Sequence, residues 1–168
     1  MELLPIVEAI EFIFPAYCAN ALPVIAGGGR PLDFGRNFID GKPVFGRNKT
    51  LRGFFFGLLI GVIVGLSESA AFGTTTFPVM LSALVPLGAL MGDLAGAFVK
   101  RRLNFAPGDL LPIVDQVDFV LGAILLSLPI SLSFLTWELV LAILIITIPI
   151  HLLTNYAAYR FGLKTNPW

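Results

Sequence analysis

The sequence predicts an all-α polytopic membrane protein with five transmembrane helices, an N-terminus outside the cell and a C-terminus in the cytoplasm. Three observations predict this fold class. Hydrophobic residues make up 57% of the 168 residues, whereas charged residues make up only 13%. The apolar residues form long runs, and the lysines and arginines lie in the segments between or after those runs.

Five apolar runs are long enough to cross a membrane as helices. A transmembrane helix needs about 20 mostly apolar residues to cross a hydrocarbon core of roughly 30 Å, because each backbone N–H and C=O must find its partner inside the segment. The first run lacks the basic region and small-residue cleavage site of a signal peptide, so we expect a retained helix. The expected helices cover about residues 3–26, 53–72, 77–99, 117–134 and 138–161, and they form a single transmembrane domain over residues 1–168.

Positive charge is confined to three segments, which are the expected loops 27–52 and 100–116 and the C-terminal end. The other two connections, Ser67–Thr76 and Ser131–Trp137, contain no Lys or Arg. The positive-inside rule therefore places the basic segments in the cytoplasm, and an odd number of crossings places the N-terminus outside.

Glycines recur every four residues on the second and third expected helices. A stripe of small residues allows the backbones of neighbouring membrane helices to approach closely, so these glycines predict packing before they predict chemistry. The two stripes are Gly53, Gly57, Gly61 and Gly65, and Gly88, Gly92 and Gly96.

Several polar side chains lie within the apolar runs. Asp93 is about 10 Å inside the cytoplasmic end of its helix, where a charge costs at least about 2.5 to 3.5 kcal/mol, so it should face protein or a water-filled cavity. Lys100 lies two helical turns further on and shares its face. Asn20, His151 and Asn155 lie at a similar depth on other helices. For His151, an interhelical hydrogen bond and a contact with a ligand are both open.

The basic segments also contain acidic residues, in a combination that suits a magnesium nucleotide. Lys49 and Lys100 would neutralise phosphate oxygens, and Asp115 and Asp118, three residues apart on one face where the fourth helix begins, would hold Mg²⁺. A topological role or contact with anionic lipid is the alternative for the basic residues, and we prefer it for Arg36. It is also preferred for Arg30 and Arg102. The sequence contains no P-loop, GxGxxG fingerprint, zinc-ligand spacing or G-x-S-x-G elbow.

Sequence blocks along nearly the whole chain resemble those of the archaeal CDP-archaeol synthases, which are related to the CDP-diacylglycerol synthases. Leu51 departs from this pattern where Trp is expected, and Ala97 where Ser is expected. The matching blocks are 15–21 (PAYCANA), 33–53, 92–94 (GDL), 98–102 (FVKRR), 107–108 (PG), 112–118 (PIVDQVD) and 151–168.

This resemblance implies a CTP-dependent lipid-phosphate cytidylyltransferase. Such an enzyme transfers CMP from CTP to 2,3-bis-O-(geranylgeranyl)-sn-glycerol 1-phosphate, with Mg²⁺ as cofactor, and releases pyrophosphate. The implied partners are CTP, an isoprenoid ether-lipid phosphate and the lipid bilayer, without nucleic acid. The implied location is the cell membrane, with an active site that faces the cytoplasm.

With these substrates, the candidate residues take three roles. The expected catalytic residues are Lys49, Lys100, Arg101 and Asp93, the expected metal ligands are Asp115, Asp118 and Asp93, and the expected substrate contacts are Asn20, Asn48, Thr50, Arg52, His151 and Asn155. The phosphate monoester of the lipid is already a nucleophile, so no strong general base is expected.

Three other classes of membrane protein are alternatives to a cytidylyltransferase. A CDP-alcohol phosphotransferase is an alternative, but its D-G-x-x-A-R motif followed by two spaced aspartates is absent. A small membrane transporter is a second alternative, although no inverted repeat is evident and the charged residues gather at one membrane face. A structural membrane scaffold, the third, predicts no binding of CTP.

Overall fold

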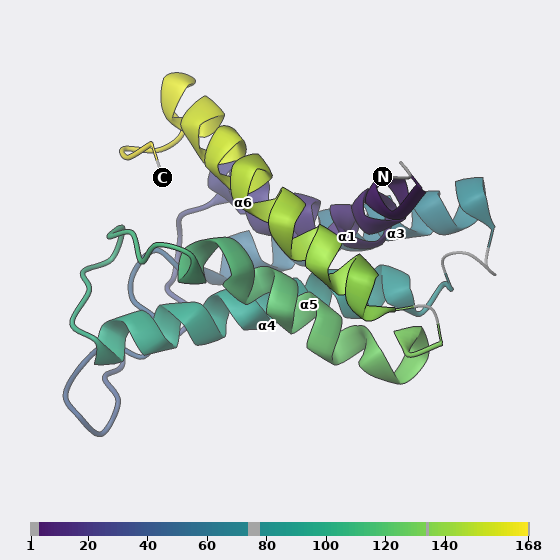
Figure 1. Cartoon of the computed structure of the whole chain (residues 1–168). Helices are drawn as coiled ribbons and strands as arrows, with labels where there is room; N and C mark the ends of the chain where they lie inside the picture. The colour runs from purple at the N-terminus through teal and green to yellow at the C-terminus, as the bar shows by residue number, and fades with distance from the viewer. Residues whose placement is uncertain (1–3, 74–77, 134, 168) are drawn as a thin grey trace.

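The computed structural model describes residues 4–73, 78–133 and 135–167, and their regular structure is helical (Figure 1). Five of the helices are long and apolar enough to cross a membrane, which confirms the all-α class and the expected set of spans. The helices are α1 (Leu4–Ala21), α2 (Pro23–Ala26), α3 (Leu51–Phe72), α4 (Leu81–Arg102), α5 (Val114–Ser131) and α6 (Trp137–Arg160).

The helix boundaries differ from the expected ones in ways that move charged residues. The first expected helix is interrupted, since α1 ends at Ala21 and Pro23, which has no N–H to donate, begins the short α2. Helix α4 continues to Arg102, and α5 begins at Val114, so the basic cluster and Asp115 belong to helices and not to the expected loop 100–116. The loops therefore cover 27–50 and 103–113. The expected helix ends at residues 3, 77 and 134 lie outside the described residues.

Helices α4 and α5 run side by side (Figure 1) and touch through their backbones. A Cβ atom added at Gly88 would lie 2.4 Å from the carbonyl oxygen of Gly122, and one added at Gly122 would lie 2.2 Å from the carbonyl oxygen of Gly88. At Gly92 an added Cβ would lie 2.2 Å from the carbonyl oxygen of Asp118. These distances leave no room for any side chain, so the glycines fix the register between the two helices.

The glycine stripe of α3 is also buried and faces α1 and α4. An added Cβ at Gly57 would lie 2.4 Å from the carbonyl oxygen of Ala19, and one at Gly61 would lie 2.4 Å from Cβ of Pro86. The close packing predicted from both stripes is therefore confirmed.

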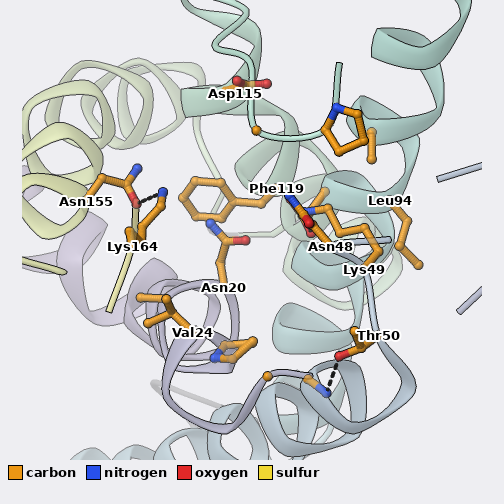
Figure 2. A pocket seen from close by; sticks show the side chains of 18 of the residues that line it. Asn20, Val24, Asn48, Lys49, Thr50, Leu94, Asp115, Phe119, Asn155 and Lys164 are labelled. Carbon is orange, nitrogen blue, oxygen red and sulfur yellow. Dashed lines mark hydrogen bonds and ion pairs between the residues drawn. The ribbon is translucent and has the colours of Figure 1, made fainter. Parts of the chain in front are cut away.

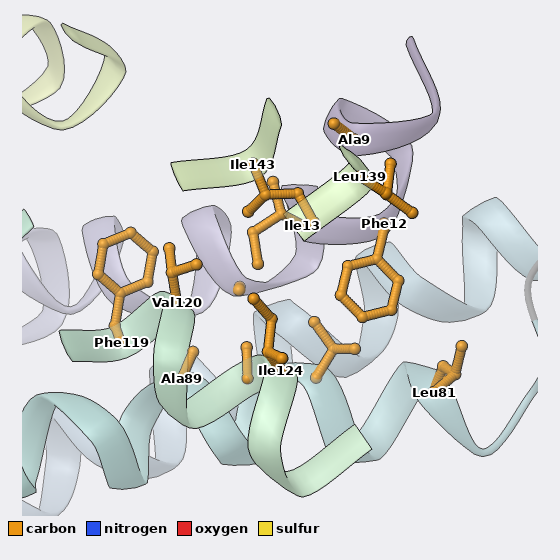
Figure 3. Packing of buried hydrophobic residues seen from close by; sticks show 13 residues of the cluster. Ala9, Phe12, Ile13, Leu81, Ala89, Phe119, Val120, Ile124, Leu139 and Ile143 are labelled. Carbon is orange, nitrogen blue, oxygen red and sulfur yellow. The ribbon is translucent and has the colours of Figure 1, made fainter. Parts of the chain in front are cut away.

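The buried apolar core lies where α1, α4, α5 and α6 meet (Figure 3). Ile13 of α1, Val120 of α5 and Ile143 of α6 are fully buried there. Large apolar side chains such as Leu59 and Ile145 instead point outward from the bundle. An apolar exterior of this kind suits a bundle whose solvent is lipid.

Candidate functional site

The loop 27–50 is organised around the buried carboxylate of Asp33. This carboxylate accepts hydrogen bonds from the backbone N–H groups of Gly35 (2.9 Å), Phe45 (3.0 Å) and Gly46 (2.8 Å). Burial alone would raise the pKa of Asp33, but the N–H donors outweigh burial and hold the pKa below its usual value. Asp33 therefore shapes the loop that carries Asn48 and Lys49.

Two expected substrate-binding residues have structural partners at the start of α3. Thr50 is the N-cap residue, and its hydroxyl accepts a hydrogen bond from the N–H of Gly53 at 3.1 Å. Arg52 donates from Nε to the carbonyl oxygen of Ala26 at 2.7 Å and from Nη2 to that of Gly27. Arg52 thus ties α3 to the end of α2.

A cavity of about 640 Å³ lies at the end of the bundle where both loops and the C-terminal segment meet (Figure 2). Apart from Arg52, which is not among its lining residues, every site residue predicted from the sequence contributes to its wall. Those residues are Asn20, Asn48, Lys49, Thr50, Asp93, Lys100, Arg101, Asp115, Asp118, His151 and Asn155. The structure thus brings together side chains from α1, α4, α5, α6 and the first loop.

Two lysine–carboxylate ion pairs line this cavity. The Nζ atom of Lys49 lies 2.6 Å from both carboxylate oxygens of Asp93, and Nζ of Lys100 lies 2.7 Å from Oδ2 of Asp115. Burial alone would lower the pKa of Lys49, but the contact with Asp93 outweighs burial and raises the pKa above its usual value. Lys49 is therefore held as a cation beside the space that a phosphate would enter, and the Lys100 ion pair lines the same space.

Arg101 brings a buried guanidinium to the same wall. Arg101 is only 6% exposed, and its Nη2 atom donates to the carbonyl oxygen of Ala106 at 3.3 Å. Its Nε and Nη1 atoms have no hydrogen-bond partner among the described residues. Buried donors of a cation are costly to leave unsatisfied, and a phosphate oxygen is a suitable acceptor for them.

Asp118 differs from the other two carboxylates because it pairs with none of the described lysines or arginines. Its Oδ1 atom accepts a hydrogen bond from the N–H of Phe119 at 2.6 Å. Its Oδ2 atom occupies the space over Gly96, where an added Cβ would lie only 1.9 Å away. The absence of a side chain at Gly96 therefore gives the Asp118 carboxylate its position.

The carboxylates fit Mg²⁺ only if the substrate supplies further ligands. In the described part of the chain, no three His, Cys, Asp or Glu side chains lie close enough together to hold a metal ion. Mg²⁺ is commonly held by one or two carboxylates together with phosphate oxygens and water. Asp118, together with Asp115 or Asp93 on the same cavity wall, meets that requirement.

The sequence did not single out Lys164, which was expected only as a topological charge. Its Nζ atom donates to Oδ1 of Asn155 at 2.9 Å, and Nδ2 of Asn155 lies 3.1 Å from Nδ1 of His151. The His151 ring stacks on Phe119 with centroids 5.9 Å apart. His151 thus makes both an interhelical contact and part of the cavity wall. Gly162, directly after the last helix, was the signal that the chain turns there.

Comparisons with known proteins agree over nearly the whole chain. A family model described as CarS-like, CDP-archaeol synthase, matches residues 1–168. The CDP-archaeol synthase of Pyrococcus abyssi is 44% identical over 168 residues, which cover 98% of this chain and 99% of that protein. The CDP-archaeol synthase of Methanocaldococcus jannaschii is 39% identical over 171 residues, covering 95% of this chain and 96% of that one.

A solved structure has the same fold. It is described as an intramembrane enzyme for archaeal membrane lipid biosynthesis, and it superposes with a TM-score of 0.81 at 40% identity, covering 89% of this chain and 94% of its own. Sequence and fold thus agree along the length that carries the cavity. The chain belongs to the CDP-archaeol synthase family.

Proposed function

We propose that this chain transfers CMP from CTP to 2,3-bis-O-(geranylgeranyl)-sn-glycerol 1-phosphate and releases pyrophosphate. The products would be pyrophosphate and the CDP-activated archaeal lipid, which is a precursor in the biosynthesis of membrane phospholipids. Membership of the CDP-archaeol synthase family supports the activity. The residues of the cavity support the chemistry.

One observation carries the proposal most directly, which is the gathering of cations and carboxylates in a single cavity within an otherwise apolar bundle. Lys49, Lys100 and Arg101 reach the cavity from the first loop and from the last turn of α4. A charged side chain in a membrane protein is expensive unless it is paired or serves a function. Here each lysine is paired, while Arg101 keeps buried donors open.

In the proposed reaction, an oxygen of the lipid phosphate attacks the α-phosphorus of CTP, and the bond from that phosphorus to the β-phosphate oxygen breaks. The electron pair leaves with pyrophosphate. Lys49, Lys100 and Arg101 stabilise the negative charge that accumulates on the phosphate oxygens. Asp118, with Asp115 or Asp93, would hold a Mg²⁺ ion that supplies further positive charge to those oxygens. No side chain is required to remove a proton, because the attacking phosphate is already ionised.

The remaining polar residues orient the substrates. Asn20 and Asn48 offer amide donors and acceptors in the cavity wall. Arg52 acts indirectly in this proposal, since its contacts with the carbonyl oxygens of Ala26 and Gly27 position the wall instead of a ligand. Thr50 likewise holds the beginning of α3.

The proposed orientation places the cavity at the cytoplasmic face of the cell membrane, with the N-terminus outside. The basic segments around the cavity support this orientation through the positive-inside rule. CTP would arrive from water past the loops 27–50 and 103–113, while the isoprenoid chains would stay in lipid. The whole chain, residues 1–168, would act as a single catalytic domain.

The test is an assay of the purified full chain in lipid vesicles with CTP labelled in the cytidine. We expect Mg²⁺-dependent incorporation of label into lipid when the lipid phosphate is present, with one pyrophosphate released per lipid labelled. Vesicles that contain the dephosphorylated lipid are the control and should gain no label. Release of CMP instead of pyrophosphate, or no incorporation at any Mg²⁺ concentration, would contradict the proposal.

A further inference from the structure

Two glutamates lie in the half of the bundle away from the cavity, where α1 begins and α3 ends (Figure 1). Glu68 is near the end of α3, roughly 22 Å along that helix from Gly53, which lines the cavity. Glu11 of α1 is close enough to Glu68 for their charges to interact. Neither glutamate lines the cavity, and the proposed reaction uses neither of them.

No positive charge compensates these carboxylates. Among the described residues, the three ion pairs all involve other acidic side chains, and the buried Oε2 atom of Glu68 accepts no hydrogen bond. The first turn of α4 packs against the same end of α3, but its N–H groups at residues 81–84 donate to carbonyl oxygens of residues 78–80. Two carboxylates without a counter-charge are costly inside a membrane protein.

Two serine hydroxyls in the same region are also buried without a partner. Ser69 is 3% exposed and Ser82 is 1% exposed, and neither Oγ atom has a hydrogen-bond partner within the described chain. A helical serine commonly donates its hydroxyl to a carbonyl oxygen of the preceding turn, as Ser67, Ser127 and Ser131 do here. The hydroxyls of Ser69 and Ser82 are instead turned away from their own helices.

The surroundings of Gly65 bring these oxygens together. A Cβ atom added at Gly65 would lie 3.2 Å from Oγ of Ser82. Glu68 and Ser69 follow Gly65 by three and four residues, so both side chains lie one turn further along the same side of α3. Side chains from three helices therefore converge on this turn. They form an oxygen cluster, which consists of Glu11, Glu68, Ser69 and Ser82.

The chemistry of the oxygen cluster suits a metal ion better than a proton. A proton shared between the two carboxylates would serve two oxygens and would leave both serine hydroxyls without a partner. Hard cations such as Ca²⁺ take carboxylate oxygens, neutral oxygens and water as ligands, in a flexible geometry. A divalent ion would also neutralise both negative charges.

We propose that the oxygen cluster binds a hard divalent cation and thereby ties α1, α3 and α4 together at the end of the bundle away from the cavity. The two carboxylates supply the charge, the two hydroxyls supply neutral ligands, and water completes the coordination. This site is separate from the metal ligands of the proposed reaction. Its role is to stabilise the bundle, so it stands or falls independently of CMP transfer.

The experiment uses Ca²⁺ as the probe, with the purified full chain in detergent and without CTP or Mg²⁺. Thermal unfolding and equilibrium binding of radioactive Ca²⁺ are measured for the unchanged protein and for Glu11→Gln, Glu68→Gln and Glu8→Gln. Glu8 is the matched control, because it is an exposed carboxylate one turn earlier on α1.

We expect Ca²⁺ to raise the unfolding temperature of the unchanged protein and of Glu8→Gln to the same extent, since a ligand that binds the folded state stabilises it. In Glu11→Gln and Glu68→Gln, the Kd for Ca²⁺ should rise at least about tenfold, and the Ca²⁺-induced shift should shrink accordingly. Without Ca²⁺, both variants should be at least as stable as the unchanged protein, because the repulsion between the carboxylates is removed.

Ser82→Ala distinguishes a ligand from a hydroxyl that is merely buried. If the hydroxyl binds the cation, the Kd for Ca²⁺ should rise about fivefold. If it does not, alanine removes an unpaired polar group and raises the unfolding temperature equally with and without Ca²⁺. That second result would overturn the serine ligands. Equal Ca²⁺ effects in all the variants, as binding at the cavity carboxylates would give, or no Ca²⁺ effect on the unchanged protein, would overturn the whole site.

Discussion

The glycine beneath the Asp118 carboxylate allows a sharp test of the metal-ligand assignment. In Gly96→Ala, the new methyl carbon would lie 1.9 Å from Oδ2, 2.8 Å from Cγ and 3.1 Å from Cβ of Asp118. Rotation about the Cα–Cβ bond of Asp118 can move Oδ2 and Cγ away, and the contact with Cβ needs a shift of only a few tenths of an ångström. The carboxylate must therefore leave its present position, whereas the backbones of α4 and α5 can stay in place.

The size of the effect follows from that overlap. To reach an ordinary contact, Oδ2 must retreat by at least about 1 Å, and a misplacement of about 1 Å can cost roughly 100-fold in rate. That loss corresponds to about 2.7 kcal/mol in the barrier. The free energy of unfolding should change little. Alanine is favoured over glycine inside a helix by up to about 1 kcal/mol, and this gain offsets the cost of moving the Asp118 side chain.

The assay pairs CMP transfer with thermal unfolding in detergent, and Gly92→Ala is the matched control. The substitution is the same and lies one turn earlier on the same helix, but the added Cβ at Gly92 meets backbone atoms of Asp118 and Gly122 that cannot rotate away. We expect Gly92→Ala to lose stability by about 1–3 kcal/mol, as in other overpacked cores. Gly96→Ala should instead lose activity with near-normal stability.

A double-mutant cycle completes this test. If Gly96 acts through Asp118, then Asp118→Asn should lose activity to a similar extent, and adding Gly96→Ala to Asp118→Asn should cost little more. Full activity of Gly96→Ala would show that the Asp118 carboxylate is not needed where the structure has it. Additive losses would show that Gly96 acts through another residue.

The remaining predictions concern charge and orientation. Asp115→Asn should lose at least about tenfold in turnover and recover in part when Mg²⁺ is raised. The control Asp40→Asn removes a carboxylate that pairs with an arginine outside the cavity, and it should remain active. Equal losses in the two variants would contradict a role of Asp115 in metal binding. Lys49→Ala should depress turnover at least about tenfold, with a loss of about 1 kcal/mol in unfolding free energy because its carboxylate partner is left unpaired. Arg36→Ala should change neither quantity much. Kinetic measurements and unfolding curves check both variants, and identical behaviour would contradict the assignment of Lys49 to the CTP phosphates. In a chain without its native cysteine, cysteines introduced at residues 70–73 should react with an impermeant reagent only from outside. Of the rest of that expected segment, Ser69 is buried and residues 74–76 lie outside the described part. Labelling from the cytoplasm would overturn the proposed orientation.

The sequence could predict the spans and the gathering of the polar residues because both follow from hydropathy and spacing along single helices. It could not predict which lysine pairs with which carboxylate. Asp93 and Lys100 share a face of α4, as expected, yet neither pairs with the other. Asp93 pairs with Lys49 of the first loop, and Lys100 pairs with Asp115 of α5. The pair of Lys100 with Asp115 depends on the register between α4 and α5, which backbone contacts at the glycines set, whereas the pair of Lys49 with Asp93 depends on how the loop 27–50 folds onto α4.

The positions of Arg52 and Lys164 relative to the cavity also could not be predicted from the sequence. Arg52 was expected to contact the nucleotide or the cavity, and the structure has its guanidinium on carbonyl oxygens after the helix break at Pro23, outside the cavity wall. Lys164 was counted only among the basic residues that set the topology, but the turn at Gly162 carries it into the cavity wall. In both cases the direction of the chain after a helix end decides the role, and hydrophobic periodicity does not encode that direction.

The direct backbone contact between α4 and α5 has a mechanical consequence. Two helices that interlock through their glycines cannot slide or separate without losing contacts along their whole length, so they form the stiff half of the molecule. Asp93, Asp115 and Asp118 all belong to that half. Helix α6 is the span with the smallest share buried inside the protein. We therefore expect the opening that admits and releases a bulky, branched lipid to be a movement of α6 together with the C-terminal turn. Amide hydrogens of α6 should accordingly exchange with solvent faster than those of the α4–α5 pair.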